Sequence, residues 1–178
     1  KIFIAGQKTF VGNALINNLK KKKYNNIINN NFSNKDLENY EIIKNFFDKQ
    51  KPEVVFLIAG MSGGISFNIN YPASLISNNI SIISNIFKIS KNYKIKKLIF
   101  MSSSCVYPKN INKDLKPSYL LTKSLEDTNK AYALSKLLGI EMVKSYNIEF
   151  KLNYVSVIPS TIFGPGDNFD SYNAHVVS

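Results

Sequence analysis

Cysteine and histidine are almost absent from this sequence, which has one residue of each among 178. A single thiol, Cys105, excludes an internal disulfide framework and is typical of a reducing compartment. Zinc sites draw most of their ligands from these two residue types, so we expect no metal site. The composition therefore favours a cytoplasmic protein that is held together by a hydrophobic core.

Long apolar runs are missing as well. The longest hydrophobic stretches are broken by Asn, Lys or Ser and fall short of the ~20 residues that span a bilayer. No signal peptide is visible in the sequence, and we expect no membrane partner. Hydrophobic residues still make up 44% of the chain, enough for one domain with a sizeable core.

Acidic residues are few, with 12 Asp and Glu against 23 basic residues, which gives a net charge of +11. Such a charge is typical of nucleic-acid-binding proteins. Here most lysines are scattered, and the one dense run, Lys20 to Lys23, ends a predicted helix, where cations complement the dipole. No nucleic-acid motif is present. We expect no nucleic-acid partner, and keep salt-dependent nucleic-acid binding as an alternative hypothesis.

Short apolar runs alternate with segments of helical period along the whole chain. Strands are predicted at 1–5, 54–59, 97–101 and 154–159, with a weaker one at 26–29. Helices are predicted at 10–19, 40–49, 72–93 and 127–146, the last capped by Asp127 or Thr128. The run at 54–59 has no polar alternation, so we expect it to be buried on both faces.

This order predicts one Rossmann-type domain over residues 1–178, a doubly wound parallel sheet with helices on both faces. The first turn, between the first strand and the first helix, suits a dinucleotide. A glycine there permits a tight turn, and backbone N–H groups at the helix start hold a pyrophosphate. The predicted cofactor-binding residues of this turn are Gly6, Gln7, Lys8, Thr9, Phe10, Val11 and Gly12. The second strand is followed by Asn29–Phe32 without an acid, and Lys8 is near, so NADP is favoured over NAD.

Tyr132 and Lys136 are four apart in a predicted helix, so their side chains share a face. We expect the ammonium to lower the pKa of the phenol and so prepare a proton donor and acceptor. By itself the pair is more typical of a solvated helix face, because such spacing arises by chance in lysine-rich chains. Serines at 102–104 follow the strand at 97–101, at the sheet edge where ligands bind. Cys105 is either a small buried hydrophobe or an acid or base, and His175 is structural, exposed or chemical.

Several motifs are collinear over essentially all of the chain. They are Phe3–Gly6 with Val11-Gly12, Gly63-Gly64-Ile65, Asn70-Tyr71-Pro72, Ser103-Ser104-Cys105-Val106-Tyr107-Pro108, Thr128-Asn129 with Tyr132-Ala133 and Lys136, Gly164-Pro165 with Asp167-Asn168, and His175-Val176. Together they resemble the extended short-chain dehydrogenase/reductase family. Within it, they are similar to the members that epimerise and reduce GDP-linked 4-keto-6-deoxy sugars.

The resemblance implies roles for single residues. Ser103, Tyr132 and Lys136 would form the reductase triad, with Tyr132 protonating the C4 oxygen and Lys136 holding the nicotinamide ribose of NADP(H). Cys105 and His175 would be the base and acid that invert the carbons next to the ketone. Met101, Ser102, Ser103, Ser104, Pro159, Ser160, Thr161, Ile162 and His175 would line the cofactor. A nucleotide-sugar substrate and a homodimer are implied as partners.

Three departures from the family pattern keep other hypotheses open. Thr9 replaces the middle glycine of the first turn. The position of the family's arginine after the second strand falls near Phe32, so Lys8 would have to bind more of the 2′-phosphate. The family also continues with a further substrate lobe. The alternatives are another nucleotide-sugar epimerase, dehydratase or reductase of the same superfamily, and a non-catalytic nucleotide-binding module.

Overall fold

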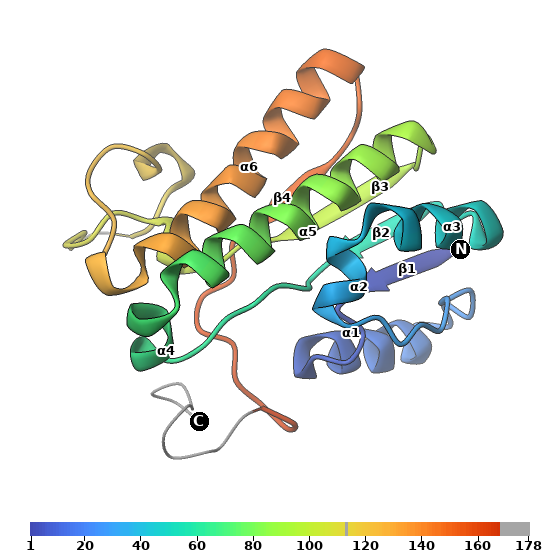
Figure 1. Cartoon of the computed structure of the whole chain (residues 1–178), viewed down its shortest axis with the longest axis horizontal. Coiled ribbons are helices and arrows are strands. Elements are labelled where there is room, and N and C mark those ends of the chain that lie inside the picture. Colours follow the sequence, from blue (N-terminus) through green and yellow to red (C-terminus); the bar gives the residue numbers. More distant parts are fainter. Residues whose placement is uncertain (113, 168–178) are drawn as a thin grey trace.

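Four parallel strands form one sheet in the order β1-β2-β3-β4 (Figure 1). The structure, a computed structural model, describes residues 1–112 and 114–167. The strands are β1 (Ile2–Ala5), β2 (Val54–Leu57), β3 (Lys97–Met101) and β4 (Val155–Val157). Parallel neighbours require a crossover between them, and helices supply each one. The predicted α/β fold with a parallel sheet is confirmed.

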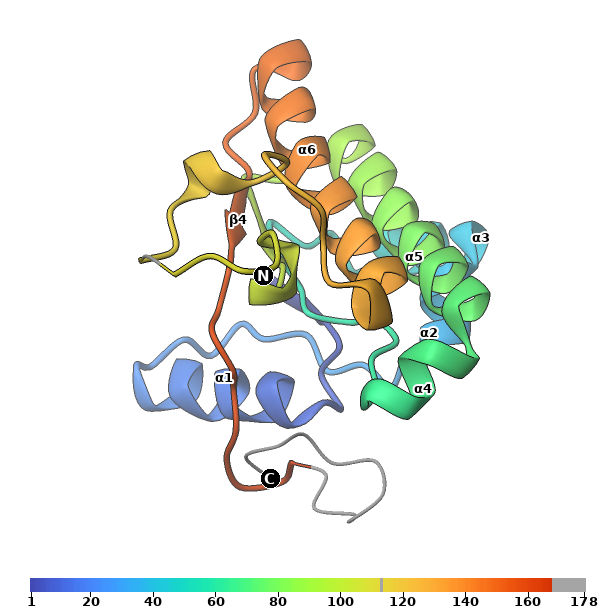
Figure 2. The ribbon, with the colours of Figure 1, turned by 90° about the vertical axis from the view of Figure 1, so that its left-hand side faces the viewer.

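The helices cover both faces of this sheet. They are α1 (Phe10–Lys21), α2 (Asn34–Glu38), α3 (Tyr40–Gln50), α4 (Ile65–Asn70), α5 (Pro72–Asn92) and α6 (Lys130–Phe150). Figures 1 and 2 show α5 and α6 side by side over one face, with α2 and α3 beside α5 and with α1 on the other side. Single 3-10 turns lie at Ser104–Val106, Pro117–Tyr119 and Asp127–Asn129. Among the described residues, no helix combines the length and hydrophobicity that crossing a membrane requires.

The connections before and after the Ile27 segment cross the sheet in opposite directions, on the two sides of β1. Helix α1 leads from β1 to Ile27, which forms a parallel bridge with Ile2, and α2 and α3 lead back to β2 on the other side of β1. The strand predicted at 26–29 is therefore only this single bridge. It does not lengthen because the next backbone N–H, that of Asn30, bonds to the side chain of Gln7 instead. A reversal of this kind marks the ligand crevice of open α/β sheets.

Burial alternates along the central strands. Val55 and Leu57 on β2, and Leu98 and Phe100 on β3, are fully buried beneath α5 and α6. Their neighbours, such as Phe56, are only half-buried. The prediction that 54–59 is buried on both faces is wrong for the described residues. On the side of the sheet that carries α1, residues such as Phe56 on β2 and Ile99 on β3 stay half-buried.

Two short helices and one helix start differ from the prediction. Helix α2 begins at a capping box in which Ser33 and Asp36 exchange side-chain and backbone hydrogen bonds. Helix α4 follows Gly64 in what was expected to be a loop. Neither Asp127 nor Thr128 caps α6, because a 3-10 turn over Asp127–Asn129 precedes the helix and Asn129 is its first flanking residue.

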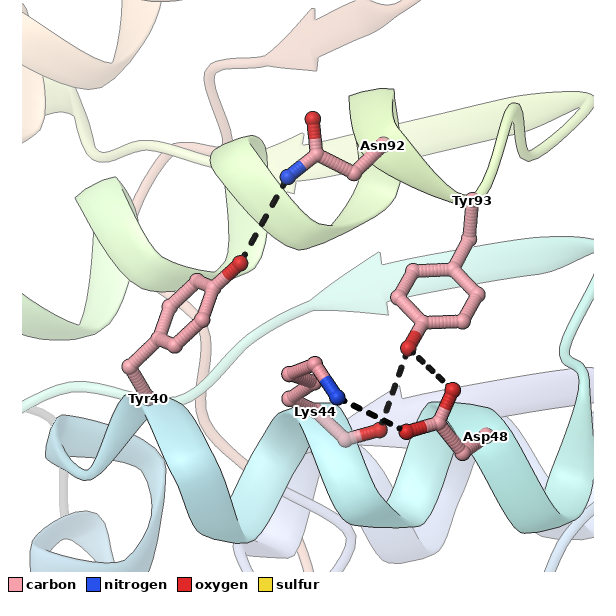
Figure 3. Close-up of polar contacts among 5 residues, drawn as sticks. All are labelled: Tyr40, Lys44, Asp48, Asn92 and Tyr93. Atoms are coloured by element: carbon pink, nitrogen blue, oxygen red, sulfur yellow. Dashed lines mark hydrogen bonds and ion pairs between the residues drawn. The ribbon is translucent and has the colours of Figure 1, made fainter.

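Polar contacts join α3 to α5 on the outside of the fold (Figure 3). The Tyr93 hydroxyl donates to Asp48 Oδ1 at 2.5 Å, and Lys44 pairs with the other carboxylate oxygen at 3.1 Å. These two hydrogen bonds, that from Tyr93 first, lower the pKa of Asp48. Asn92 donates to the Tyr40 hydroxyl near the start of α3. The contacts fix the angle at which α3 lies on α5.

A close contact places α6 directly on the sheet. A Cβ added at Gly139 would lie 2.2 Å from Cζ of Phe100, a ring in the buried core. Glycine in a helix interior costs about 1 kcal/mol relative to alanine. Glycine is nevertheless required at this position, because the Phe100 ring fills the space that a side chain would need.

We therefore expect Gly139→Ala to destabilise the fold, against the usual helix preference. The added methyl overpacks the Phe100 contact and lowers the free energy of unfolding by ~1–3 kcal/mol. Urea unfolding followed by circular dichroism measures the change. Ser145→Ala, on the exposed side of the same helix, serves as the control and is expected to be neutral or slightly stabilising. Equal effects of the two substitutions would contradict this packing argument.

Candidate active site

Lys136 is a lysine inside the protein, with 4% of its surface exposed. Its ammonium donates a hydrogen bond to the Met101 carbonyl at the end of β3, at 3.2 Å. It also lies 5.4 Å from the Phe100 ring centre and 5.7 Å from that of Tyr132. Burial disfavours the charged form and lowers the pKa of Lys136 to about 8. Helix α6 thus anchors the ammonium beneath the carboxyl edge of the sheet.

Tyr132 lies one turn earlier on α6 and faces two residues that follow β3. Burial first, and then the nearby Cys105, raise the pKa of Tyr132 to about 12, against the opposing effect of a side-chain hydrogen bond with Ser103. The Ser103 hydroxyl also accepts from the Cys105 backbone N–H at 3.4 Å. The structure thus brings Ser103, Cys105, Tyr132 and Lys136 together.

The expectation that Lys136 lowers the pKa of Tyr132 is wrong for this structure. Its ammonium is directed to the Met101 carbonyl and lies over the phenol ring rather than beside the hydroxyl. The phenol of Tyr132 is therefore protonated throughout the neutral range. A protonated phenol is the form that donates a proton to a substrate oxygen.

The ends of β3 and β4 are tied together next to these residues. Ser102 N–H donates to the Val157 carbonyl at 2.9 Å, and Ser104 N–H donates to the Pro159 carbonyl at 3.1 Å. The buried Ser102 hydroxyl donates to the Lys136 carbonyl at 3.4 Å. The predicted cofactor-lining segments 101–104 and 159–162 therefore lie side by side.

The glycine turn is on the other side of β2. Gly6 has a φ of +104°, and a Cβ there would lie 2.6 Å from the backbone nitrogen of Ala59. A Cβ on Gly60, the residue after Ala59, would lie 2.7 Å from Oδ1 of Asn79 and 3.6 Å from the Lys136 ammonium. Only glycine fits both positions without strain. The backbone at Ala59 and Gly60, after the end of β2, thus lies between the glycine turn on one side and Lys136 on the other.

The turn itself fits a dinucleotide, with one change. Thr9 caps α1, because its hydroxyl accepts from Gly12 N–H at 3.0 Å and donates to the Gly6 carbonyl at 2.8 Å. The Gly12 N–H is therefore occupied. The Phe10 and Val11 N–H groups, in the first turn of α1, have no backbone or side-chain acceptor among the described residues. They point where a pyrophosphate binds at a helix start.

The predicted 2′-phosphate region is built from amides. Gln7 accepts from Asn30 Nδ2 at 2.8 Å and donates to Asn29 Oδ1 at 2.9 Å. Lys8 is exposed beside them and lowers the pKa of Asp36 by its charge, after the larger effect of hydrogen bonds from Ser33. The region has a cation and no carboxylate hydrogen-bonded to these amides, which suits a phosphate better than a free ribose hydroxyl.

Two residues of the family motifs, Asn168 and His175, lie outside the described residues.

Asn79 is a buried residue of the site that was not predicted from the sequence. It is 1% exposed on α5, accepts a hydrogen bond from Met61 N–H at 2.7 Å and donates one to the Met61 carbonyl at 2.9 Å. It holds the loop after β2 against Lys136. The sequence offered one sign of this role: Asn79 lies among the apolar residues of the helix predicted at 72–93, where an amide must find a buried partner.

Cys105 opens onto a pocket of about 420 Å³ that is lined by Ser104, Cys105, Tyr107, Pro108, Asn110, Ile111, Leu115, Glu126 and Asn129. The pocket adjoins the end of β3 and the start of α6. A substrate in it would have one end at the Cys105 thiol.

A family model for NAD-dependent epimerases and dehydratases matches residues 2–178. The chain belongs to this epimerase/dehydratase family. GDP-L-fucose synthase 1 of Arabidopsis thaliana is 37% identical over 177 residues, which cover 99% of this chain and 55% of that protein. The chain thus spans about half the length of the curated relatives that it matches.

Solved structures of the family agree in fold. A GDP-mannoheptose C4 reductase from Campylobacter jejuni with NADP bound superposes with a TM-score of 0.86 at 34% identity, covering 92% of this chain and 52% of that one. A GDP-L-fucose synthetase from Naegleria fowleri bound to NADP gives a TM-score of 0.85 at 27% identity, covering 99% and 58%. The resemblance inferred from the motifs is confirmed.

The buried ammonium makes a prediction about stability. Below pH 8 Lys136 is charged in the folded and unfolded protein, and the folded state bears the full cost of burial. Between about pH 8 and the unfolded pKa of 10.5 the folded state loses this proton first, so the cost falls. We expect Lys136→Met to raise the free energy of unfolding at pH 7 by up to ~3 kcal/mol.

Urea unfolding of both proteins at pH 7, 9 and 10.5 measures this difference. The gain should shrink steadily over the series. A gain that is constant or grows with pH would show that burial of the charge is not its cause.

Proposed function

We propose that this protein is an NADP-dependent epimerase/reductase that converts GDP-4-keto-6-deoxy-mannose into GDP-L-fucose. The observation that carries the proposal is the meeting of Ser103, Cys105 and Tyr132 beside the buried Lys136. The names of the relatives support the sugar and the nucleotide, and the two NADP-bound neighbours support the cofactor. This activity is proposed for the full-length protein, because the relatives that carry these names are about twice as long as this chain.

The reductive step follows from the geometry at α6. NADPH, when bound along the carboxyl edge, supplies the hydride to C4. Tyr132 is protonated at neutral pH and gives its proton to the C4 oxygen, while the Ser103 hydroxyl polarises the same oxygen. The Lys136 ammonium contributes positive charge beneath this oxygen without taking the proton from Tyr132.

The epimerisation needs a base and an acid on the carbons next to the ketone. The ketone acidifies the protons at C3 and C5, so one polarising site serves both inversions and the reduction. The opening of Cys105 onto the pocket supports its role in proton exchange at these carbons. His175 is proposed as its partner from the family motif.

A reductase without epimerase activity is the second candidate. The Campylobacter jejuni heptose reductase is nearly as similar to this chain as the Arabidopsis thaliana synthase. The two functions differ in whether Cys105 exchanges a proton with the substrate carbons, which an experiment resolves.

We also propose a cytoplasmic homodimer. The single thiol is consistent with a reducing compartment. Helix α6 is apolar on both sides: Leu134 and Leu138 are 39% and 37% exposed on the side away from the sheet. They lie one turn apart and beside α5, so two copies could bury these helix pairs against each other.

The activity test uses full-length protein, GDP-4-keto-6-deoxy-mannose and NADPH. We expect NADPH oxidation, and a loss of about 10²-fold or more in Tyr132→Phe, which keeps the ring but not the proton. Cys105→Ala should abolish deuterium incorporation from D₂O at C3 and C5, as measured by NMR. Folded wild-type protein that oxidises no NADPH would refute the function. Undiminished exchange in Cys105→Ala would remove Cys105 from the epimerisation.

The dimer is tested by sedimentation of full-length Leu134→Lys/Leu138→Lys. Two charges on the proposed interface should convert dimer to monomer. Leu121→Lys, an exposed leucine of the loop before α6, is the matched control and should remain dimeric. An unchanged mass for the double variant would place the interface elsewhere.

A further inference from the structure

An amide pair joins α4 to the start of α6. Asn68 Nδ2 donates to Asn129 Oδ1 at 2.9 Å, across 61 residues of chain. The Asn68 side chain is 9% exposed, and its Oδ1 is buried without a partner among the described residues. Leaving a buried acceptor unpaired is costly. The cost suggests that this contact is kept for something other than stability.

Asn129 gives up its ordinary local role for this contact. An asparagine that flanks a helix start usually caps it by accepting from an N–H of the first turn. Asn129 occupies that position of α6 but makes no such cap. Its Oδ1 accepts from Asn68 instead, so the amide is turned away from the helix. Departures from local preference of this kind concentrate at functional sites.

The turned amide leaves a donor at the pocket beside Cys105. Asn129 is half-buried and lines this pocket. Its Nδ2 donates no hydrogen bond to any of the described residues. Since Asn68 holds Oδ1, the group that Asn129 can offer a ligand is an N–H donor in a fixed direction.

The charge of the residues that line the pocket indicates which part of a nucleotide-sugar could bind there. Among the described residues that line it, Glu126 is the only charged one. Hydrogen bonds from Thr128, first of all that of its side chain, lower the pKa of Glu126 and keep the carboxylate ionised. Lys109 lies close enough to Glu126 for their charges to interact, but it pairs with Asp127 Oδ2 at 2.8 Å and is not among the lining residues. The lining therefore carries a negative charge, which disfavours a diphosphate. Hydroxyl and keto oxygens of a sugar, by contrast, suit the amide and hydroxyl groups.

We propose that Asn129 is a substrate-binding residue that donates a hydrogen bond to a sugar oxygen beside Cys105, and that Asn68 is the positioning residue that orients it. The inference rests on the proposed function, because the ligand is taken to be the sugar of the nucleotide-sugar. Asn68 also fixes the start of α6, from which Tyr132 projects one turn later. The same contact therefore places the sugar relative to the proton donor.

The test uses full-length protein and the reactivity of Cys105. Its alkylation by iodoacetamide is followed by mass spectrometry at increasing GDP-4-keto-6-deoxy-mannose, and separately with GDP, which lacks the sugar. Each rate is divided by that of the same variant without ligand. Asn129→Asp keeps an acceptor for Asn68 but loses the donor, Asn129→Ala loses both without adding charge, and Asn68→Leu releases the amide. Asn70→Ala, on the exposed part of α4, is the control.

We expect the sugar nucleotide to protect Cys105 in the wild type and GDP to protect it poorly. Half-protection should need about tenfold more sugar nucleotide in both Asn129 variants, and a smaller increase in Asn68→Leu. Asn70→Ala should match the wild type, and NADPH affinity, measured by fluorescence, should be the same throughout. Equal half-protection in Asn129→Asp, Asn129→Ala and wild type would overturn the proposal.

Wild-type turnover separates this inference from the proposed function. Protection that depends on Asn129 without NADPH oxidation would leave the sugar contact standing and refute the reaction. Normal turnover with unchanged protection in the Asn129 variants would refute the contact alone. Loss of NADPH affinity in these variants would assign Asn129 to the fold and overturn the proposal.

Discussion

The burial of one ammonium organises this site. Lys136 is held between the end of β3 and the rings of Phe100 and Tyr132, and within residues 1–112 and 114–167 its ammonium has one hydrogen-bond acceptor, the Met101 carbonyl. A buried cation with so little compensation is costly to the fold. Gly60, which lies beside the ammonium, leaves room for the Asn79 side chain, and Asn79 in turn holds the loop that carries Gly60. In the proposed reaction, this charge would stabilise the substrate oxygen as it becomes negative.

The residues around this ammonium come from separate parts of the chain. The ends of β2 and β3 and the first turns of α6 meet at one edge because parallel strands place all their carboxyl ends together. The glycine turn after β1 reaches the same edge from the other side of β2. A cofactor along this edge would touch the turn, the serines after β3 and Lys136 in succession. The fold thus accounts for the proximity of the glycine turn and Tyr132.

The family pattern is varied here at its first turn. Thr9 uses its hydroxyl to cap α1 and occupies Gly12 N–H, which leaves the pyrophosphate the earlier N–H groups of that helix. Amides replace cations around the 2′ position, apart from Lys8. These differences bear on how tightly the cofactor is held. They leave the geometry of Ser103, Cys105 and Tyr132 untouched, because those residues depend on β3 and α6.

The alternation of strands and helices and the resemblance to a family could be predicted from the sequence, because apolar periodicity and motif spacing are local properties. The sequence also placed Tyr132 and Lys136 on one helix face. The direction of the Lys136 ammonium could not be predicted in this way, since its burial and the Met101 carbonyl depend on strands far away in the sequence. The fold revealed it. It also showed that 26–29 is a single bridge, that β2 is buried on one face, and that Asn129 turns from its helix to Asn68. Each depends on a partner far away in the chain.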